Sequence, residues 1–531
     1  MKPLPTGLQV FENIRKKGAL YVDKTDMVYE IVSGARMQFF LSRPRRFGKS
    51  LLCWTLDALF SGKKELFEGL AISKTDWEWE SYPVIHLDMS KVNTTDGSAG
   101  VKKSLADQTG DIADTHGLDL RGETEPGRML ELIIIKTAKK YGKPAVVIVD
   151  EYDKPFLDFY NKPPMAQEVR DIMRSYYSQF KANEPSMRFL FMTGISKFTK
   201  AGVFSTLNNL NDISLDEKFG TLLGYTEEEL VDYFSEYLES GAKKLNMSPD
   251  ELVEKLRANY NGFCFDGTQT VYCPFSVLNF FGNYRLLNYW IDSANPKIIA
   301  DFMKDKRLTV EQFREFPISM DFAFRPGEIE SSPPESFLYQ AGYLTIRKGA
   351  GNDFKLDYPN AEVLNSMSEL VYKNMTQRDG NFLDLRSPLV RALENGNCEL
   401  FIETLNRLLS SILYDDYNNA AKQAIAQTGI KITTQEWLYR STILAFLHGC
   451  DVLAFGEMHG SKGRSDLIVS YAGTTFVIEF KVARNDDCDT LAAEALKQIS
   501  GKQYAAPYAN AKKIGLAIDD KMRQVGAWVE G

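Results

Sequence analysis

The sequence predicts an α/β protein, with a parallel sheet near its N-terminus, a helical middle and a second α/β domain at its C-terminus. The parallel sheet is predicted by apolar runs such as 145–149, which suit strands covered on both faces, and by the amphipathic segments 98–108 and 126–141, which suit crossover helices. The C-terminal domain is predicted by a strand pair over 466–482 with a turn at 472–474. A chain of 531 residues is long enough for about three to four domains, each with its own core.

The first strand of the sheet is predicted at 37–41, and the loop after it ends in Gly48-Lys49-Ser50 before a predicted helix. A strand, such a loop and a helix form the context in which backbone N–H groups and a helix N-terminus bind phosphates. Lys49 would then contact the β- and γ-phosphates, and Ser50 a magnesium ion. The general pattern places glycine where this chain has Arg43, so the opening turn of the loop must form differently. A lone Gly-Lys-Ser also occurs by chance, so the prediction needs support from elsewhere.

Two further predicted strands place polar groups at the same end of the sheet. The run 145–149 ends in Asp150 and Glu151, and acids at the carboxyl end of a parallel strand lie where α/β folds bind ligands. Asp150 could hold magnesium, and Glu151 could polarise the water that attacks the γ-phosphate. A helix cap after a core strand would explain Asp150 alone. The run 188–192 ends in Thr193, which could sense the γ-phosphate, although threonine after a strand is usually a turn former.

The loop also carries positive charge that we expect to lie near bound phosphates. The remaining strand of this sheet is predicted at 83–88, where we interpret His86 as a core-strand residue rather than a catalyst. The candidate nucleotide-binding residues are Arg45, Arg46, Phe47, Gly48, Lys49, Ser50, Leu51 and Thr193.

The middle of the chain is predicted to be mainly helical. Thr226, followed by acids, predicts a helix start, and Leu230 and Phe234 fall on one face of that helix, which suits a lid-like region. The segments 338–346 and 354–357 then predict two strands that resemble the wing of a winged-helix module. From there to residue 430 the pattern is mostly that of amphipathic helices.

The C-terminal strand pair carries two carboxylates and a lysine at a chemically informative spacing. Asp466 opens the first strand, and Glu479 and Lys481 lie two residues apart on the second, so their side chains share a face. Asp466 and Glu479 could hold magnesium through oxygen ligands, while Lys481 orients the attacking water or stabilises charge on a phosphate. This pattern points to metal-dependent cutting of nucleic acid. The alternative is a surface hairpin with an exposed salt bridge.

The composition excludes several other classes of protein. Hydrophobic residues make up 44% and charged residues 25% of the chain, as in ordinary globular proteins. No apolar run reaches the roughly 18 to 20 residues that span a bilayer, and the start lacks the apolar core of a secretion signal, so we expect a cytoplasmic protein without membrane contact. The six cysteines contain no C-x-x-C pair, which disfavours structural zinc and disulfides. Because the net charge is −8, nucleic-acid contacts must come from local basic patches.

Taken together, the motifs resemble a bacterial family of AAA-ATPase-like proteins whose C-terminal domain belongs to the PD-(D/E)XK nuclease superfamily. The resemblance covers nearly the whole chain. It implies a P-loop NTPase parallel sheet with a helical lid and a winged-helix-like middle, plus a restriction-endonuclease-like α/β domain. We expect the boundaries 1–222, 223–330, 331–430 and 431–531. The most specific matches are 21–25 (Tyr-Val-Asp-Lys-Thr), 43–50 (Arg-Pro-Arg-Arg-Phe-Gly-Lys-Ser), 193–198 (Thr-Gly-Ile-Ser-Lys-Phe) and the Gly-Arg-Ser-Asp and Glu-Phe-Lys pair that begins at 463.

The resemblance also implies cofactors, partners and further site residues. ATP and Mg²⁺ are the implied cofactors, with Mn²⁺ as an alternative at the nuclease site, and DNA is the implied substrate, with RNA and a homo-oligomer left open. Glu436, from the helix before the hairpin, is the candidate that completes the metal shell, and Glu457 is its rival. Gln498 and Tyr504, on the helix after the hairpin, match positions that pack beside or contact such sites. The expected function is nucleotide-regulated cleavage of nucleic acid, and the alternative is a nucleotide-binding sensor or scaffold that does not cut.

Overall fold

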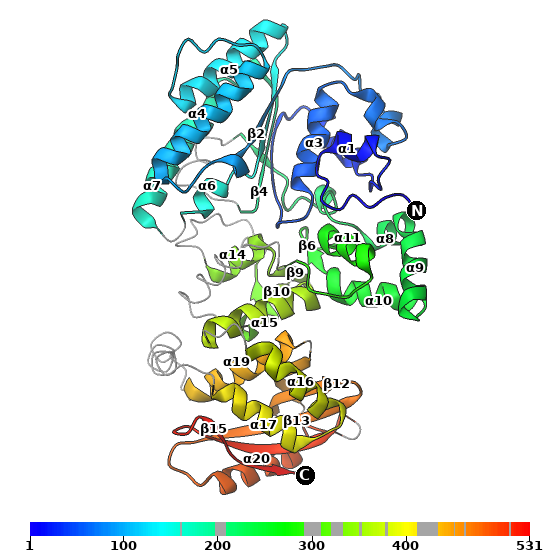
Figure 1. The fold of residues 1–531 in the computed structure, drawn as a ribbon, viewed down its shortest axis with the longest axis vertical. Coiled ribbons are helices and arrows are strands. Elements are labelled where there is room, and N and C mark those ends of the chain that lie inside the picture. The colour runs from blue at the N-terminus through cyan, green and yellow to red at the C-terminus, as the bar shows by residue number, and fades with distance from the viewer. Residues whose placement is uncertain are drawn as a thin grey trace. The chain divides into compact units, whose positions relative to one another are not determined.

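The chain forms two compact units in this computed structural model (Figure 1). One unit comprises Met1–Ala294 and Glu315–Asn360, and the other comprises Asn295–Arg314 and Ala361–Gly531. The finer division of the chain into four parts remains a prediction. The structure describes residues 1–159, 162–196, 209–290, 310–319, 333–349, 353–376, 381–410, 434–450, 452–460, 463–508 and 511–531.

The first unit is built on a parallel sheet with the strand order β2-β3-β4-β1-β5. Its strands are β1 (Gln38–Ser42), β2 (Val84–Asp88), β3 (Ala145–Asp150), β4 (Met187–Gly194) and β5 (Asn211–Asp212). Every residue of β3 is buried, as expected for a central parallel strand covered on both faces. The predictions of strands at 37–41, 83–88, 145–149 and 188–192 are therefore confirmed.

Helices cover both faces of this sheet (Figure 1). On one face lie α4 (Gly97–Thr115), α5 (Pro126–Tyr141) and α7 (Pro163–Ala182), whose apolar side chains join those of the strands in one core. On the other face lie α1 (Phe11–Lys16), α2 (Thr25–Ser33) and α3 (Lys49–Phe60), of which α3 follows β1 directly. This places the N-terminus of α3 at the carboxyl edge of the sheet, as the sequence predicts.

A helical lid follows the sheet, as predicted from Thr226 onward. Its helices are α8 (Glu227–Tyr233), α9 (Ser235–Leu245), α10 (Pro249–Tyr260) and α11 (Pro274–Asn283). Thr226 and Glu229 form a capping box, in which each satisfies a backbone N–H group at the start of α8. The apolar core of the lid includes Leu20 and Val22 from the N-terminal segment.

The first unit ends in a small antiparallel sheet with the order β8-β10-β9, preceded in the chain by a helix. These elements are β8 (Phe316–Ile318), α14 (Pro334–Ala341), β9 (Thr345–Lys348) and β10 (Phe354–Asp357). The predicted strand at 338–346 is wrong in its first half, because residues 338–341 form the last turn of α14. Pro334 in the first turn favours that helix, and Gly342 ends it in the left-handed conformation with φ at 88°.

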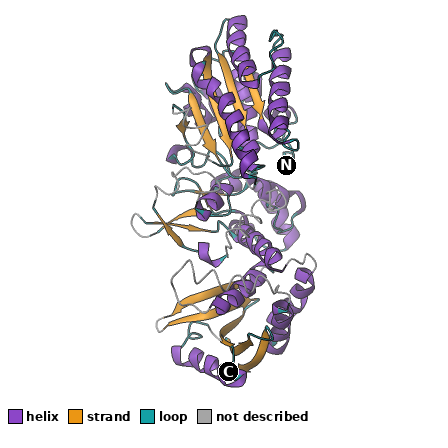
Figure 2. Ribbon diagram, turned by 90° about the vertical axis from the view of Figure 1, so that its left-hand side faces the viewer, coloured by secondary structure: helices purple, strands orange, loops and turns teal. Residues whose placement is uncertain are grey.

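The second unit contains a mixed sheet, whose strands are orange in Figure 2. These strands lie side by side in chain order. Its strands are β11 (Leu453–Gly460), β12 (Gly463–Tyr471), β13 (Thr474–Ala483), β14 (Lys512–Asp519) and β15 (Gln524–Glu530), and its helices are α15 (Ala361–Thr376), α16 (Asn381–Glu394), α17 (Cys398–Leu409), α19 (Thr434–Gly449) and α20 (Cys488–Lys502). The predicted hairpin is present as β12 and β13. Helix α20 crosses over between β13 and β14, which are parallel.

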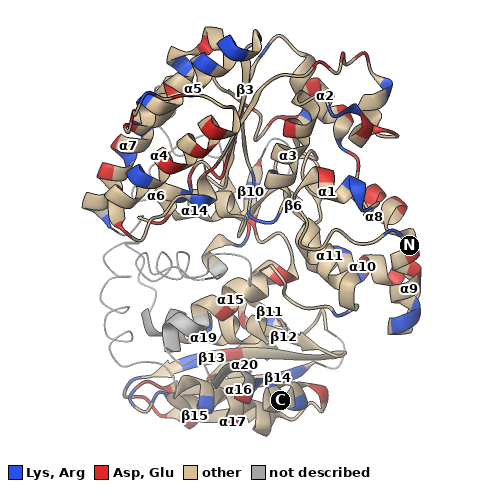
Figure 3. Ribbon diagram, turned by 45° about the horizontal axis from the view of Figure 1, so that its top comes forward, with Lys and Arg blue, Asp and Glu red and all other residues tan. Residues whose placement is uncertain are grey.

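Acidic and basic residues are interspersed along the helices of the first unit, as the red and blue segments of α4, α5 and α7 show (Figure 3). Among the described helices, none is both long enough and apolar enough to span a membrane.

Candidate functional sites

The candidate phosphate loop connects β1 to α3, and its carbonyl groups accept hydrogen bonds from the lysine that follows it. Arg46 and Gly48 adopt left-handed conformations, with φ at 69° and 93°. The ammonium of Lys49 donates hydrogen bonds of 3.0 Å to the carbonyl oxygens of both Arg43 and Pro44. Burial lowers the pKa of Lys49, while the nearby carboxylates of Glu151, Asp150 and Asp153 act in the opposite direction. The loop is thus folded around a buried lysine that acids surround.

Arg43, which stands where the general pattern has glycine, has a structural role. Its side chain is 1% exposed, and its guanidinium donates to the carbonyl oxygens of Ser42 at 2.9 Å, Ser214 at 2.7 Å and Phe219 at 2.9 Å. Burial lowers the pKa of Arg43 to about 10. The guanidinium therefore anchors the start of the loop to the segment 214–219, which replaces the tight glycine turn.

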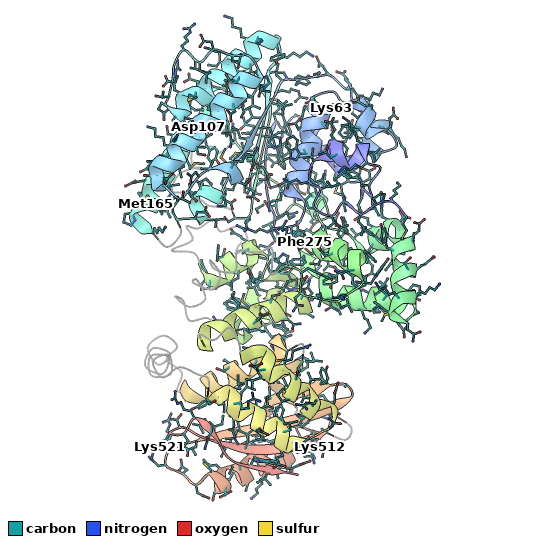
Figure 4. The ribbon with its side chains drawn as sticks, viewed as in Figure 1. Lys63, Asp107, Met165, Phe275, Lys512 and Lys521 are labelled. Carbon is teal, nitrogen blue, oxygen red and sulfur yellow. The ribbon has the colours of Figure 1, made fainter. Side chains whose placement is uncertain are left out.

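The outer side of the loop packs against aromatic residues of the lid. The ring of Phe47 makes edge contacts with Phe263 at 4.8 Å and Phe265 at 5.4 Å between centroids. The guanidinium of Arg46 lies 4.6 Å over the ring of Phe275. Phe275 is on α11 and is labelled in Figure 4. The predicted role of Arg46 near bound phosphates remains a prediction, and in this structure its charge lies against an aromatic face. Phe47 thus joins the loop to the lid.

Asp150 and Ser50 meet at the carboxyl end of β3. Asp150 is 5% exposed, and its Oδ1 atom has no hydrogen-bond partner among the described residues. Burial raises the pKa of Asp150, while the neighbouring Ser50 hydroxyl and Lys49 lower it. A buried carboxylate oxygen without a partner is costly. The hydroxyl and carboxylate oxygens are the hard donors that Mg²⁺ prefers, so these two residues fit a magnesium ion.

Glu151 and Thr193 complete the set of residues at this edge. Glu151 is in the left-handed conformation with φ at 51°. Thr193 is fully buried, and its hydroxyl donates to the carbonyl oxygen of Leu41 at 2.7 Å. A contact between Thr193 and a phosphate would thus require another rotamer. Because β4 lies between β1 and β3, the loop, the acid pair and Thr193 end three neighbouring strands at a topological switch point, where α/β sheets bind ligands.

In the second unit, Asp466 and Glu479 hold each other in place. The backbone N–H of Asp466 donates to Glu479 Oε2 at 3.2 Å, and the backbone N–H of Phe480 donates to Asp466 Oδ2 at 3.0 Å. The ladder between β12 and β13 reaches Leu467 opposite Ile478 and stops there. The two carboxylates therefore replace backbone hydrogen bonds where the strands separate, which brings them together as predicted.

Lys481 joins the same cluster through Gln498 of α20. The ammonium of Lys481 lies 3.7 Å from Glu479 Oε1 and donates to Gln498 Oε1 at 2.9 Å. The side-chain amide of Gln498 in turn donates to Glu479 Oε1. Glu479 is only 2% exposed, so its charge depends on these donors. Gln498 thus orients both the acid and the lysine.

Three further residues were predicted at or beside this site: Glu436, Glu457 and Tyr504. Glu436 lies in α19 and Glu457 in β11, but their side chains are outside the described part of the structure. Within the described residues, no three His, Cys, Asp or Glu side chains form a group that could hold a metal. Tyr504 was predicted on α20 but follows the end of that helix, where it packs with Val477 and Ile499.

Comparisons with known proteins match both ends of the chain. The family described as predicted AAA-ATPase matches residues 5–204, and the PD-(D/E)XK nuclease superfamily matches residues 434–528. An "uncharacterized protein in vnfD 5'region" of Azotobacter chroococcum mcd 1 is 32% identical over 520 residues, which cover 96% of this chain and 94% of that protein.

Two solved structures also align with the chain. They are Cdc6p from Pyrobaculum aerophilum and the ORC2 protein of Aeropyrum pernix, each 11% identical, covering 66% of this chain and 92% of its own. Their TM-scores of 0.22 and 0.23 are too low to support a structural conclusion. The full-length relative and the two family matches do decide the assignment: the chain belongs to the family of predicted AAA-ATPases that carry a C-terminal PD-(D/E)XK nuclease superfamily domain.

Proposed function

We propose that this protein binds ATP and cleaves nucleic acid in its C-terminal domain, and that the bound nucleotide controls the cleavage. The observation that carries the proposal is the cluster of Asp466, Glu479 and Lys481, in which each carboxylate accepts a backbone N–H from the other's strand and the ammonium lies 3.7 Å from Glu479. Two neighbouring carboxylates can hold a divalent ion, and a lysine beside them can stabilise the charge that builds on a phosphodiester during cleavage.

The donor chemistry of the nuclease cluster fits Mg²⁺ or Mn²⁺. Asp466 and Glu479 would hold the ion, with Glu436 or Glu457 as the third acid. When bound, such an ion supplies a more acidic water and stabilises charge on the phosphate. Lys481 would stabilise the negative charge that builds on the cleaved phosphate, and Gln498 keeps Lys481 and Glu479 oriented for this.

The nucleotide site is proposed at the carboxyl edge of the parallel sheet. Lys49 would leave the carbonyl oxygens of Arg43 and Pro44 to bind the β- and γ-phosphates at the N-terminus of α3. Ser50 and Asp150 would hold the magnesium ion that accompanies ATP, and Asp150 Oδ1 is available for it. Glu151 would accept the proton of the attacking water.

Control by nucleotide is supported by how the loop packs. Phe47, Arg46 and Pro44 contact the lid residues Phe263 and Phe275 and the backbone near Gly342. A loop that rearranges around phosphates must therefore shift these neighbours.

DNA is the proposed substrate, and the cytoplasm is the proposed location.

A nucleotide-dependent sensor or scaffold is the second candidate. The observation that favours it is that Lys481 and Glu479 form an ion pair and are both hydrogen-bonded to Gln498. Such a closed cluster could stabilise a domain that binds nucleic acid or protein without cutting.

The first experiment is a cleavage assay with the purified full chain. Linear, circular and single-stranded DNA and RNA are incubated in Mg²⁺ or Mn²⁺, with and without ATP. Asp466→Ala and Lys49→Ala are compared with the exposed-residue controls Asp486→Ala and Lys64→Ala. Cleavage that disappears in Asp466→Ala but not in Asp486→Ala establishes the nuclease, and an ATP response that changes in Lys49→Ala but not in Lys64→Ala establishes the control. Binding without any product under both metals would favour the scaffold.

A further inference from the structure

Asp153 has a buried carboxylate and has no role in the function proposed above. Its side chain is 1% exposed. Its Oδ2 atom accepts three hydrogen bonds, from Ile195 N at 3.0 Å, Ser196 N at 2.7 Å and Ser196 Oγ at 2.7 Å. A single oxygen thus satisfies the donors that follow the end of β4, in a site from which water is excluded.

Tyr152 makes a second connection between the same two segments. Its backbone N–H donates to the carbonyl oxygen of Thr193 at 3.0 Å, and its hydroxyl donates to the carbonyl oxygen of Ser196 at 2.7 Å. Tyr177 of α7 supports it by donating to the carbonyl oxygen of Tyr152 at 3.0 Å. Residues 152–153 therefore hold residues 193–196 at both ends.

Gly194 is required by this arrangement. A Cβ atom added at Gly194 would lie 2.6 Å from Asp153 Oδ1 and 2.6 Å from Tyr152 Cδ1. Either neighbour could move away only at the expense of its own hydrogen bonds to residues 195–196. The glycine in the Thr-Gly-Ile-Ser motif thus leaves space for the Asp153 carboxylate and the Tyr152 ring, which hold this motif in place.

The turn before Asp153 contains a strained backbone conformation, which the hydrogen bonds of Asp153 can maintain. Glu151 has φ at 51°, a conformation that costs free energy for a residue with a side chain and persists only where its surroundings impose it. The carbonyl oxygen of Glu151 accepts from Lys154 N at 3.0 Å, which closes the turn. The hydrogen bonds that Asp153 accepts from Ile195 and Ser196, directly after β4, therefore hold the turn that presents Glu151.

We infer that Asp153 is a positioning residue for ATP hydrolysis, which fixes the left-handed turn at Glu151 by binding Ile195 and Ser196. This inference rests on the proposed nucleotide site. Asp153 itself is too buried to touch the reacting atoms, and its effect passes through Glu151 and the motif at 193–196. Displacement of a catalytic group by about 1 Å can cost about a hundredfold in rate. Loss of the hydrogen bonds of Asp153 should therefore lower the rate of ATP turnover more than it lowers the affinity for ATP.

The test compares steady-state ATP hydrolysis by the full chain and its variants. Asp153→Asn keeps the shape but loses the charge, and Ser196→Ala removes one of the three donors. Thr109→Ala is the matched control, because the buried hydroxyl of Thr109 bonds to Tyr176 at 2.7 Å in the α4 and α7 core of the same unit. We expect kcat to fall at least about tenfold in Asp153→Asn and less in Ser196→Ala, with KM for ATP within about twofold of the wild type.

Melting temperatures separate positioning from general loss of stability. Thr109→Ala should keep the wild-type kcat even where its melting temperature falls as far as that of Asp153→Asn. An unchanged kcat in Asp153→Asn, or equal losses in Asp153→Asn and Thr109→Ala, overturns the inference. If Asp153→Asn does not fold, an unchanged kcat in Ser196→Ala overturns it and a lowered one supports it. Wild-type turnover no greater than that of Lys49→Ala overturns the proposed nucleotide site, and this inference with it.

Discussion

The ammonium of Lys49 donates to the carbonyl oxygen of Pro44 at 3.0 Å, so the residue expected to bind phosphates is folded into its own loop. The same ammonium bonds to Arg43 O, and acids lie around it. A triphosphate must therefore compete with two carbonyl groups for this lysine.

The first prediction concerns the removal of that lysine. Lys49→Ala should lower ATP affinity by about ten- to a hundredfold, because a hydrogen bond to a charged group contributes about 1.5 to 3 kcal/mol. Titration with a fluorescent ATP analogue measures the change. Lys64→Ala, at an exposed position, should bind like the wild type. Equal affinities in all three proteins would contradict the assignment of the loop.

Installing the glycine of the general phosphate-loop pattern should harm this protein. Arg43→Gly removes hydrogen bonds to two buried carbonyl groups and one partly buried one, and each buried group left unsatisfied costs about 1 to 3 kcal/mol. We expect a loss of at least about 3 kcal/mol in the free energy of unfolding, measured with urea. Arg45→Gly, which adds the same backbone freedom at a half-buried position, should lose less. A stable Arg43→Gly protein would show that the arginine is dispensable for the fold.

The contact between Pro44 and Gly342 predicts a link between the loop and the C-terminal end of α14. A Cβ atom at Gly342 would lie 2.5 Å from Pro44 Cβ, so Gly342→Ala should displace the loop and weaken ATP binding several-fold. Gly142→Ala is the matched control, because Gly142 also has a positive φ, at 66°, but an added Cβ meets nothing within 4 Å. Both variants should lose about 1 kcal/mol or more of stability. Only Gly342→Ala should lose ATP affinity, and identical affinities would refute the link.

Local signals explain why most of the fold could be predicted. An apolar run ended by acids, as at 145–151, specifies both a buried strand and its end, and β3 follows it closely. The prediction of a strand over the whole segment 338–346 was wrong in its first half, because an apolar run of this length fits a strand and a helix equally well. The left-handed Gly342 decides between them, because it ends the helix and separates it from the strand that follows.

The candidate sites were predictable where spacing alone carries the chemistry. Asp466, Glu479 and Lys481 meet because strand periodicity and one turn suffice to place them. The roles of Arg43 and Asp153 could not be predicted, because their partners lie 171 residues away in Ser214 and 43 residues away in Ser196. The recurrence of an acid two residues after Glu151 was the only available signal for Asp153.

Gln498 should matter to cleavage through the two groups that it joins. Gln498→Ala removes a partner from both Lys481 and the buried Glu479, so we expect cleavage to fall about ten- to a hundredfold. Glu494→Ala, at an exposed position of the same helix, should cut normally. Initial rates on the preferred substrate give the comparison, and full activity in Gln498→Ala would mean that the cluster orients itself without the amide.

The last prediction is a pH dependence of stability in the second unit. His448 is 2% exposed, its Nε2 atom lies 2.7 Å from the carbonyl oxygen of Ala454, and its Nδ1 atom has no partner among the described residues. Burial, with a smaller effect from Arg314, lowers the pKa of His448 from 6.5 to about 4. The unfolded chain therefore takes up a proton as the pH falls through 6.5, while the folded chain stays neutral until about 4.

Stability should accordingly fall between these two pH values, and His448 should account for about 2 kcal/mol of the loss at pH 5. His448→Gln keeps a donor for Ala454 but has no proton to gain. The free energy of unfolding, measured with urea at pH 7.5 and pH 5, should drop by about 2 kcal/mol less in His448→Gln than in the wild type. Equal drops in the two proteins would mean that His448 is as easily protonated in the folded chain as in the unfolded one, and that its burial does not disfavour the charged ring.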